Sequence, residues 1–212
     1  MSEQPEPLWS RWARELQAIA QNGLHYSQNA FDVERYMRLR EIAAEMWAQG
    51  TGLETTTLLQ IFSEQFGYAT PKVDVRVVVF QQAKILLVQE QSDGGWSLPG
   101  GWADANESPS EAIVREIFEE SGYQTRAQKL LAVYDRSKQG HRTICPFHVY
   151  KLFIRCEPIG GKPTPSHETL DVQFFTKTEL EALFLSESRT TRAQLQRMFV
   201  HLENPSRPAD FD

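Results

Sequence analysis

Apolar residues recur at helical spacing through the first third of the chain and then give way to strand-like runs. Residues 8–21, 31–49 and 54–66 each place apolar side chains three or four positions apart, which predicts three helices. A glycine follows each segment as a stop signal. Three short helices bury little surface by themselves, so we expect them to pack on the remaining domain or on a second copy of the chain.

The helical pattern ends at Thr70-Pro71, which we take as a domain boundary. The runs expected as strands are 73–80, 84–89, 130–134, 143–156 and 171–175. The later segments expected as helices are 109–121, 178–184 and 190–202. This order predicts an α/β sandwich over 71–203, preceded by a small all-helical domain over 1–70 and followed by a loose tail over 204–212.

Composition and charge exclude several classes of protein. Apolar residues make up 41% and charged residues 24%, which argues against a disordered chain. The longest apolar runs are far shorter than the roughly 20 residues of a membrane span. The first six residues carry two acids and no apolar stretch, so we expect no secretory signal. A net charge of −6 without a basic block disfavours binding to nucleic acid.

The two cysteines favour a reducing compartment. Cys145 and Cys156 fall in one predicted extended segment, where a straight strand would separate them by roughly 35 Å. That distance is outside the reach of a disulfide. We therefore expect a cytoplasmic protein.

The sequence marks both ends of the helix at 109–121. Ser108 is a favourable N-cap, Pro109 suits the first helical position, and Glu111 completes a capping box with Ser108. Gly122 stands where a left-handed C-terminal cap belongs. At about 100° per residue, the apolar side chains of this helix share one arc, which is expected to be the buried one. These are Ile113, Val114, Ile117 and Phe118.

Three glutamates crowd a different arc of the same helix. Glu116, Glu119 and Glu120 are three or four positions apart or adjacent, and Glu107 could approach from the preceding loop. Like charges at such spacing cost roughly 0.2–0.5 kcal/mol per pair. One interpretation is a solvated acidic face. The other is a site for Mg²⁺ or Mn²⁺, which prefer carboxylate oxygens and keep positions open for water and phosphate.

Residues 101–123 are similar to the Nudix box, which runs glycine, five residues, glutamate, seven residues, Arg-Glu-apolar, one residue, Glu-Glu, one residue, Gly-apolar. The matching positions are Gly101, Glu107, Arg115, Glu116, Ile117, Glu119, Glu120, Gly122 and Tyr123. The runs 12–20 and 34–43 resemble the helical extension of a bacterial Nudix subgroup that includes ADP-ribose and CDP-choline pyrophosphatases. The resemblance implies a Nudix α/β/α sandwich with a mixed β-sheet behind an N-terminal helical domain.

The resemblance also implies the chemistry. A Nudix enzyme hydrolyses the diphosphate bridge of a nucleoside diphosphate linked to a group X, with Mg²⁺ or Mn²⁺ as cofactor. Glu116, Glu119 and Glu120 are then the expected metal ligands, and Glu119 or Glu120 could also accept the proton from water. We expect Arg115 to orient a box glutamate by ion pairing. Gly100 and Gly101 are expected to let the loop backbone approach the substrate closely.

Two residues outside the box have open assignments. Several Nudix enzymes resembling ADP-ribose hydrolases use a glutamate from a late loop as the base, and Glu168 occupies such a position; an exposed loop acid is the other interpretation. Arg76 interrupts an apolar strand, so its charge needs a partner or a ligand. Contact with a substrate phosphate and an ion pair with Asp74 or another acid are equally compatible with this position.

Two further classes of function compete with the enzyme. A nucleotide-binding sensor on a Nudix scaffold is one alternative, although such proteins lose box glutamates and this chain retains them. The other is a DNA-binding role for the helical region. Its arginines are interleaved with acids, which favours an interaction or dimerisation element. We therefore expect a homodimer that binds a small nucleoside diphosphate derivative and neither nucleic acid nor membrane.

Overall fold

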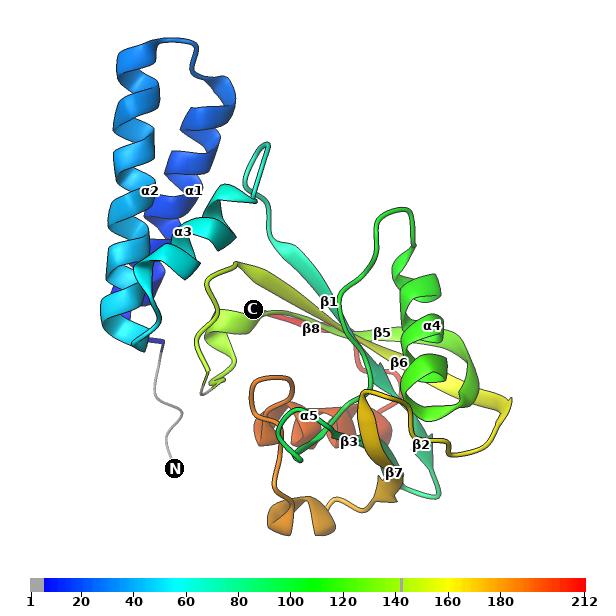
Figure 1. Ribbon diagram of the computed structural model, residues 1–212. Helices are drawn as coiled ribbons and strands as arrows, with labels where there is room; N and C mark the ends of the chain where they lie inside the picture. Colours follow the sequence, from blue (N-terminus) through cyan, green and yellow to red (C-terminus); the bar gives the residue numbers. More distant parts are fainter. Residues whose placement is uncertain (1–5, 142) are drawn as a thin grey trace. The chain divides into compact units, whose positions relative to one another are not determined.

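The computed structural model describes residues 6–141 and 143–212 and divides the chain into two compact units (Figure 1). The first unit takes the chain up to Pro71 together with Ile144–His148. The second unit holds Lys72–Thr143 and Val149–Asp212. The division between Pro71 and Lys72 coincides with the end of the helical sequence pattern.

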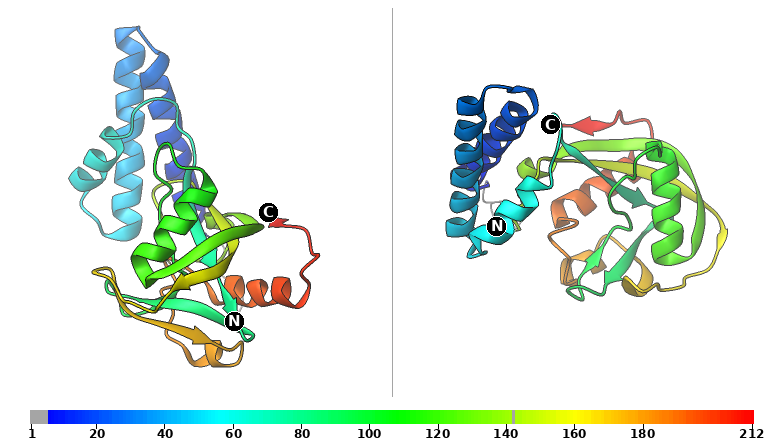
Figure 2. Two further views of the ribbon diagram at one scale, coloured as in Figure 1. Left: turned by 90° about the vertical axis from the view of Figure 1, so that its right-hand side faces the viewer. Right: turned by 45° about the horizontal axis from the view of Figure 1, so that its top comes forward.

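The first unit is a bundle of three helices, α1 (Leu8–Tyr26), α2 (Ala30–Thr51) and α3 (Thr55–Ser63). α1 and α2 run side by side in opposite directions (Figure 2). Their contact is close because small residues line it: Ala13 of α1 is buried with Ala43 and Ala44 of α2. Trp47, Leu58 and Phe62 complete this small core.

A later segment of the chain belongs to this helical unit. The sequence predicts one strand over 143–156, but the strand β6 begins only at Val149 and runs to Gly161. Ile144 instead packs against the core of the helices, and Arg14 Nη1 donates to the carbonyl of Cys145 at 2.9 Å. The prediction was wrong here because residues of the helical unit bind this segment, and sequence periodicity does not report such long-range contacts.

The second unit contains two small β-sheets. The strands of the first sheet are β1 (Lys72–Val78), β6 (Val149–Gly161), β5 (Tyr123–Asp135) and β8 (Asp210–Phe211), in that spatial order. The second sheet contains β2 (Phe80–Gln81), β3 (Lys84–Glu90), β4 (Trp96–Ser97) and β7 (Thr169–Phe175), with β7 and β4 both paired to β3. The first sheet is mixed, because β1 is parallel to β6 and β5 is antiparallel to it.

Two helices cover this β-structure from separate sides (Figure 1). α4 (Pro109–Ser121) buries Ile113 and Ile117 in one hydrophobic cluster with β1. α5 (Arg192–Glu203) buries Leu195 and Phe199 in the other cluster, with β3 and β6. The predicted α/β sandwich behind a helical N-terminal region is confirmed.

The expected ends of α4 are confirmed in detail. The Ser108 hydroxyl accepts from the Glu111 amide, the Glu111 carboxylate accepts from the Ser108 amide, and Gly122 adopts φ +73°. Phe118, however, is 52% exposed, so the expected apolar arc is wrong at that position. The buried arc is rotated toward the glutamates.

Two expectations for the last part of the chain need correction. Residues 178–184 form a 3₁₀ turn at Glu179–Ala182 instead of an α-helix. Residues 204–212 are not a loose tail, because β8 pairs with β5. Asp210 fixes this strand by accepting hydrogen bonds from Arg197 and His201 of α5. A short charged segment gives little strand signal in sequence, since its partners lie elsewhere in the chain.

None of the helices within the described residues is long and apolar enough to cross a membrane. Residues 1–5, on which most of the signal-peptide expectation rests, lie outside the described residues. Cys145 and Cys156 are both free thiols, as expected.

A loop that precedes α4 follows the edge of β1. The amide of Val77 donates to Pro99 O and the amide of Val75 donates to Gly101 O, each at 2.8 Å. Gly100 lies between these two anchors at φ +135°, a conformation that is essentially restricted to glycine. A Cβ added to Gly100 would stand 2.0 Å from Val75 O, so this loop requires glycine at position 100.

We expect Gly100→Ala to lower the free energy of unfolding by more than about 3 kcal/mol, because backbone strain and a backbone clash add together. Gly94→Ala is the matched control: Gly94 also has positive φ (+71°), but a Cβ there meets nothing within 4 Å. That change should cost only about 1 kcal/mol. Urea denaturation of both variants tests this expectation, and equal losses would contradict it.

Candidate functional site

The glutamates of α4 occupy two environments. Glu116 and Glu120 are buried, at 9% and 4% exposure, on the face that also carries Ile113 and Ile117. The side chain of Glu119 is 57% exposed. A fully solvated acidic face is therefore excluded for Glu116 and Glu120. Buried carboxylates four residues apart, on one helix face, need compensation from charge or hydrogen bonds.

Arg115 gathers the remaining acids of the box. Its Nε and Nη2 donate to the two carboxylate oxygens of Glu107 at 2.8 and 2.9 Å. Its Nη1 donates to Glu116 Oε1 and to Glu119 Oε2, both at 3.0 Å. The hydrogen bond to Glu107 is the main reason that the pKa of Arg115 is raised. Arg115 thus ties the loop that precedes α4 to two helix glutamates through ion pairs.

Glu120 is joined to the glycine loop. The Gly100 amide donates to Glu120 Oε2 at 2.8 Å. At Gly101, an added Cβ would lie 3.1 Å from either carboxylate oxygen of Glu116. Gly100 and Gly101 therefore let the backbone come against both buried carboxylates, which brings the loop and the helix into one site.

The electrostatics of this site are dominated by burial. Burial raises the pKa of Glu120 to about 8, although Arg76 and the Gly100 amide lower it in part. The charges of Glu90 and Glu116 raise it further. Burial also raises the pKa of Glu116, against the effect of Arg115. Two acids that resist ionisation lie within electrostatic reach of each other, so a nearby dication would lower the pKa of both.

The donor set fits a hard divalent cation. Carboxylate oxygens are the ligands that Mg²⁺ and Mn²⁺ prefer, and Glu116 and Glu120 supply them in a water-poor position. Within residues 6–141 and 143–212, however, no three His, Cys, Asp or Glu side chains converge as a preformed metal group. The reason is visible in the contacts: Arg115 holds Glu116 and Glu119, whereas Glu120 turns toward the Gly100 amide.

Glu168 lies on a loop that is attached to the same helix. Thr169 Oγ1 donates to the carbonyl of Glu120 at 2.8 Å, which holds this loop at the C-terminal end of α4. The Glu168 side chain is exposed and its carboxylate lies 3.3 Å from His167 Nε2. The structure thus brings the loop to α4, but it does not bring the Glu168 carboxylate into a contact with the box glutamates.

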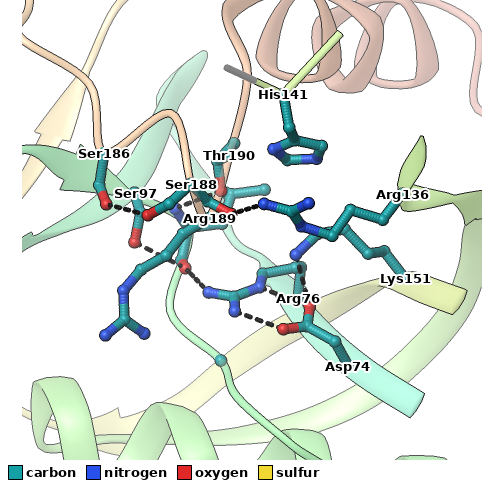
Figure 3. Close-up of polar contacts among 12 residues, drawn as sticks. Asp74, Arg76, Ser97, Arg136, His141, Lys151, Ser186, Ser188, Arg189 and Thr190 are labelled. Carbon is teal, nitrogen blue, oxygen red and sulfur yellow. Dashed lines mark hydrogen bonds and ion pairs between the residues drawn. The ribbon is translucent and has the colours of Figure 1, made fainter. Parts of the chain in front are cut away.

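Arg76 is buried beside Asp74, which also contacts Lys151 (Figure 3). Its Nε and Nη2 donate to the two oxygens of Asp74, and its Nη1 donates to the carbonyl of Leu98 at 3.2 Å. The side chain is 3% exposed. The ion pair with Asp74 is therefore present, and a phosphate has no open access to this guanidinium.

Sequence reasoning missed three charged residues near the loop. Lys151 donates to Asp74 at 2.8 Å, and Glu90 accepts from Ser97 Oγ at 2.5 Å and pairs with Arg189 at 3.2 Å. Lys151 could have been found by the argument used for Arg76, because it also interrupts an apolar strand. Arg189 lies in a polar loop and carries no such signal.

In this α/β sandwich, the helix α4 and the glycine loop bring two buried carboxylates, Glu116 and Glu120, against the loop backbone. Residues 70–196 match the family described as the NUDIX domain, and residues 7–62 match the one described as the UDP-X-like N-terminal oligomerisation domain. The chain belongs to the Nudix family. It is a hydrolase of phosphorus-containing acid anhydrides.

Three relatives cover two thirds of the chain or more. The Bacillus subtilis (strain 168) protein YjhB is 41% identical over 204 residues, which is 96% of this chain and 97% of YjhB. The crystal structure of a UDP-X diphosphatase covers 96% of this chain and 98% of its own, at 30% identity and a TM-score of 0.61. That of an ADP-ribose pyrophosphatase from Streptococcus suis 89-1591 covers 68% of this chain and 100% of its own, at 39% identity and a TM-score of 0.60.

We expect Glu120→Gln to stabilise the metal-free protein at high pH. The pKa of Glu120 is raised from 4.5 to about 8, so its contribution to stability is complete below pH 4.5 and is lost as the pH rises through 8. Glutamine keeps the acceptor for the Gly100 amide and carries no charge. In EDTA at pH 8.5, the variant should melt at least about 2 °C above wild type, and the difference should vanish near pH 4.5.

The control for this measurement is Glu119→Gln, because Glu119 is exposed on the same helix. It should change the melting temperature little at either pH. A Glu120→Gln variant that melts at or below the wild-type temperature at pH 8.5 would contradict the burial of this charge.

Proposed function

We propose that the chain is a Mg²⁺- or Mn²⁺-dependent pyrophosphohydrolase that cleaves the diphosphate bridge of a nucleoside diphosphate linked to X. The observation that carries this proposal is the pair of buried carboxylates, Glu116 and Glu120, set against the backbone of Gly100 and Gly101. A solvated surface would not bury two acids in this way. A site that binds a cation next to a polyanionic ligand would explain why Glu116 and Glu120 are buried.

Glu116, Glu119 and Glu120 would hold the metal ion, which when bound neutralises the phosphate oxygens and makes a water molecule more acidic. Arg115 restricts the positions of Glu116 and Glu119, and the Gly100 amide restricts that of Glu120, although the three carboxylates do not converge in these positions. Glu119, Glu120 or Glu168 accepts the proton of the attacking water. The loop backbone at Gly100 and Gly101 has no side chain that would keep a phosphate away.

ADP-ribose and CDP-choline are the substrates that we propose first. ADP-ribose is supported by the similarity to the pyrophosphatase from Streptococcus suis. UDP-linked compounds are further candidate substrates, because the UDP-X diphosphatase structure matches both units. Two free thiols support the cytoplasm as the place of action.

The proposed reaction is tested by phosphate release from a panel of nucleoside diphosphate derivatives in the presence of added phosphatase and Mg²⁺ or Mn²⁺. We expect Glu116→Gln and Glu120→Gln to lower turnover at least tenfold, about 1.4 kcal/mol, because they remove charge from the metal site. Glu111→Gln is the control on the same helix, since glutamine preserves the capping box. Nucleotide binding without hydrolysis of any compound would indicate a sensor instead.

The role of Glu168 has a separate test. If its carboxylate accepts the proton, Glu168→Gln should lower kcat at least tenfold, about 1.4 kcal/mol, with little change in KM. Glu181→Gln, on the exposed 3₁₀ turn, is the control, because glutamine keeps the acceptor for Gln196 Nε2. Unchanged turnover in the Glu168 variant would leave Glu119 and Glu120 as the remaining bases.

We also propose that the chain forms a homodimer through α1. Leu8, Trp12, Ile19 and Tyr26 lie within about 40° of one another around this helix and are 46–68% exposed. The opposite face, with Ala13 and Ala20, is buried. Four large apolar side chains of α1 are thus exposed along one stripe, which is expected of a helix that packs against a second copy.

Ile19→Glu should therefore halve the mass of the full chain in size-exclusion chromatography with light scattering, because a charge in the interface would be buried without a partner. Leu170→Glu is the matched control, since Leu170 is equally exposed but lies on the second unit. A monomeric wild-type protein would end the dimer proposal.

A further inference from the structure

We propose that Asp74, Arg76 and Lys151 form a buried clamp that positions the glycine loop and, through Gly100, the carboxylate of Glu120. The three residues are positioning residues for the proposed hydrolysis, so the catalytic part of this inference rests on the proposed function. None of them belongs to the box or contacts the box glutamates directly.

The clamp is built around one carboxylate. Asp74 Oδ1 accepts from Arg76 Nε and from Lys151 Nζ, both at 2.8 Å, and Asp74 Oδ2 accepts from Arg76 Nη2 at 2.6 Å. All three side chains are at most 9% exposed. Asp74 and Lys151 are register partners on the parallel strands β1 and β6. The geometry of the clamp is therefore fixed by the sheet itself.

Arg76 connects this carboxylate to the loop. Asp74 holds Nε and Nη2 of Arg76 (Figure 3). The planar guanidinium can then present Nη1 in one direction only, and that direction leads to the carbonyl of Leu98. The loop then meets β1 through Pro99 O and Gly101 O. With the flanking residues held, the Gly100 amide is left to point at Glu120.

The alternative, that Arg76 binds substrate, conflicts with this geometry. Each of its three nitrogens already donates to a protein oxygen, and its side chain is 3% exposed. Stability is also a poor explanation, since a buried ion cluster seldom outperforms well-packed apolar residues of similar volume. A guanidinium held in a bidentate ion pair fixes the direction of its remaining N–H groups, which an apolar side chain cannot do.

The charge of Arg76 also acts on Glu120. Its guanidinium attracts the carboxylate of Glu120, and it is the largest of the opposing effects on that buried acid. Loop geometry and the charge of Arg76 thus serve the same glutamate. A lysine at position 76 would retain the positive charge but lose the two parallel hydrogen bonds of the guanidinium. This one substitution therefore separates the effect of the charge from the effect of the hydrogen-bond geometry.

The test is Arg76→Lys in the full chain, measured first by amide hydrogen exchange in NMR without metal or substrate. Loss of the two parallel hydrogen bonds should speed exchange of the Gly100 amide at least tenfold, while amides in β3 keep their rates. In the hydrolysis assay, kcat should fall at least tenfold and KM should stay within about threefold. Leu131→Ala, a core truncation in β5, is the control for a general loss of stability.

Faster exchange at Gly100 in the lysine variant and not in the control supports the clamp. An unchanged Gly100 amide overturns it, and so does a rise in KM with kcat retained, which would indicate a contact between Arg76 and substrate. If Arg76→Lys does not fold, Lys151→Met is measured in the same way and should speed Gly100 exchange to a smaller degree. A wild-type protein that hydrolyses no compound of the panel would contradict the proposed function. The exchange rate of the Gly100 amide would still test the clamp, because it is measured without substrate.

Discussion

The hydrogen bond from the Gly100 amide to the Glu120 carboxylate is the interaction on which the site depends. It joins the loop residue that directly precedes the box, in a loop anchored on β1, to a glutamate of the box on the helix α4. A glycine is required at the donor, because the backbone there is at φ +135° and runs against Val75 O. The position of a box glutamate thus depends on the backbone geometry of the residue that precedes the box.

In the same site, the burial of two glutamates opposes their ionisation. Glu116 and Glu120 are buried beside each other, and burial raises the pKa of both. Arg115 and Arg76 oppose this from two directions, one through direct hydrogen bonds to Glu116 and one through the field that it exerts on Glu120. The two acids are therefore only partly compensated within the protein, and a nearby cation would lower the pKa of both.

Local signals made much of this structure predictable from sequence. Ser108, Glu111 and Gly122 define the ends of α4 through contacts within four residues, and the spacing of the glutamates follows from the helix. The burial of Glu120 was not predictable in that way, because it depends on a loop twenty residues earlier in the chain. The error at Phe118 has the same origin: periodicity finds an apolar arc, but the surrounding sheet decides which arc is covered.

Long-range pairs account for what the sequence left undecided about Arg76. Its strand showed a charge in need of a partner, and the local candidate, Asp74, is indeed the partner. The second cation on that carboxylate, Lys151, comes from a strand 77 residues away. The ion pair with Asp74 was thus within reach of local reasoning, whereas the contribution of Lys151 depends on the pairing of β1 with β6, which no local pattern reports.

The two units solve different problems of packing. The second unit closes its own core between two sheets and two helices. The first unit has a narrow core of alanines with a few large side chains, and it leaves the apolar stripe of α1 outside. Small residues allow α1 and α2 to approach closely, but they bury little area, and burial is what stabilises a helix pair in water. The match of this unit to an oligomerisation domain fits that deficit, since a second copy would supply the missing apolar contact.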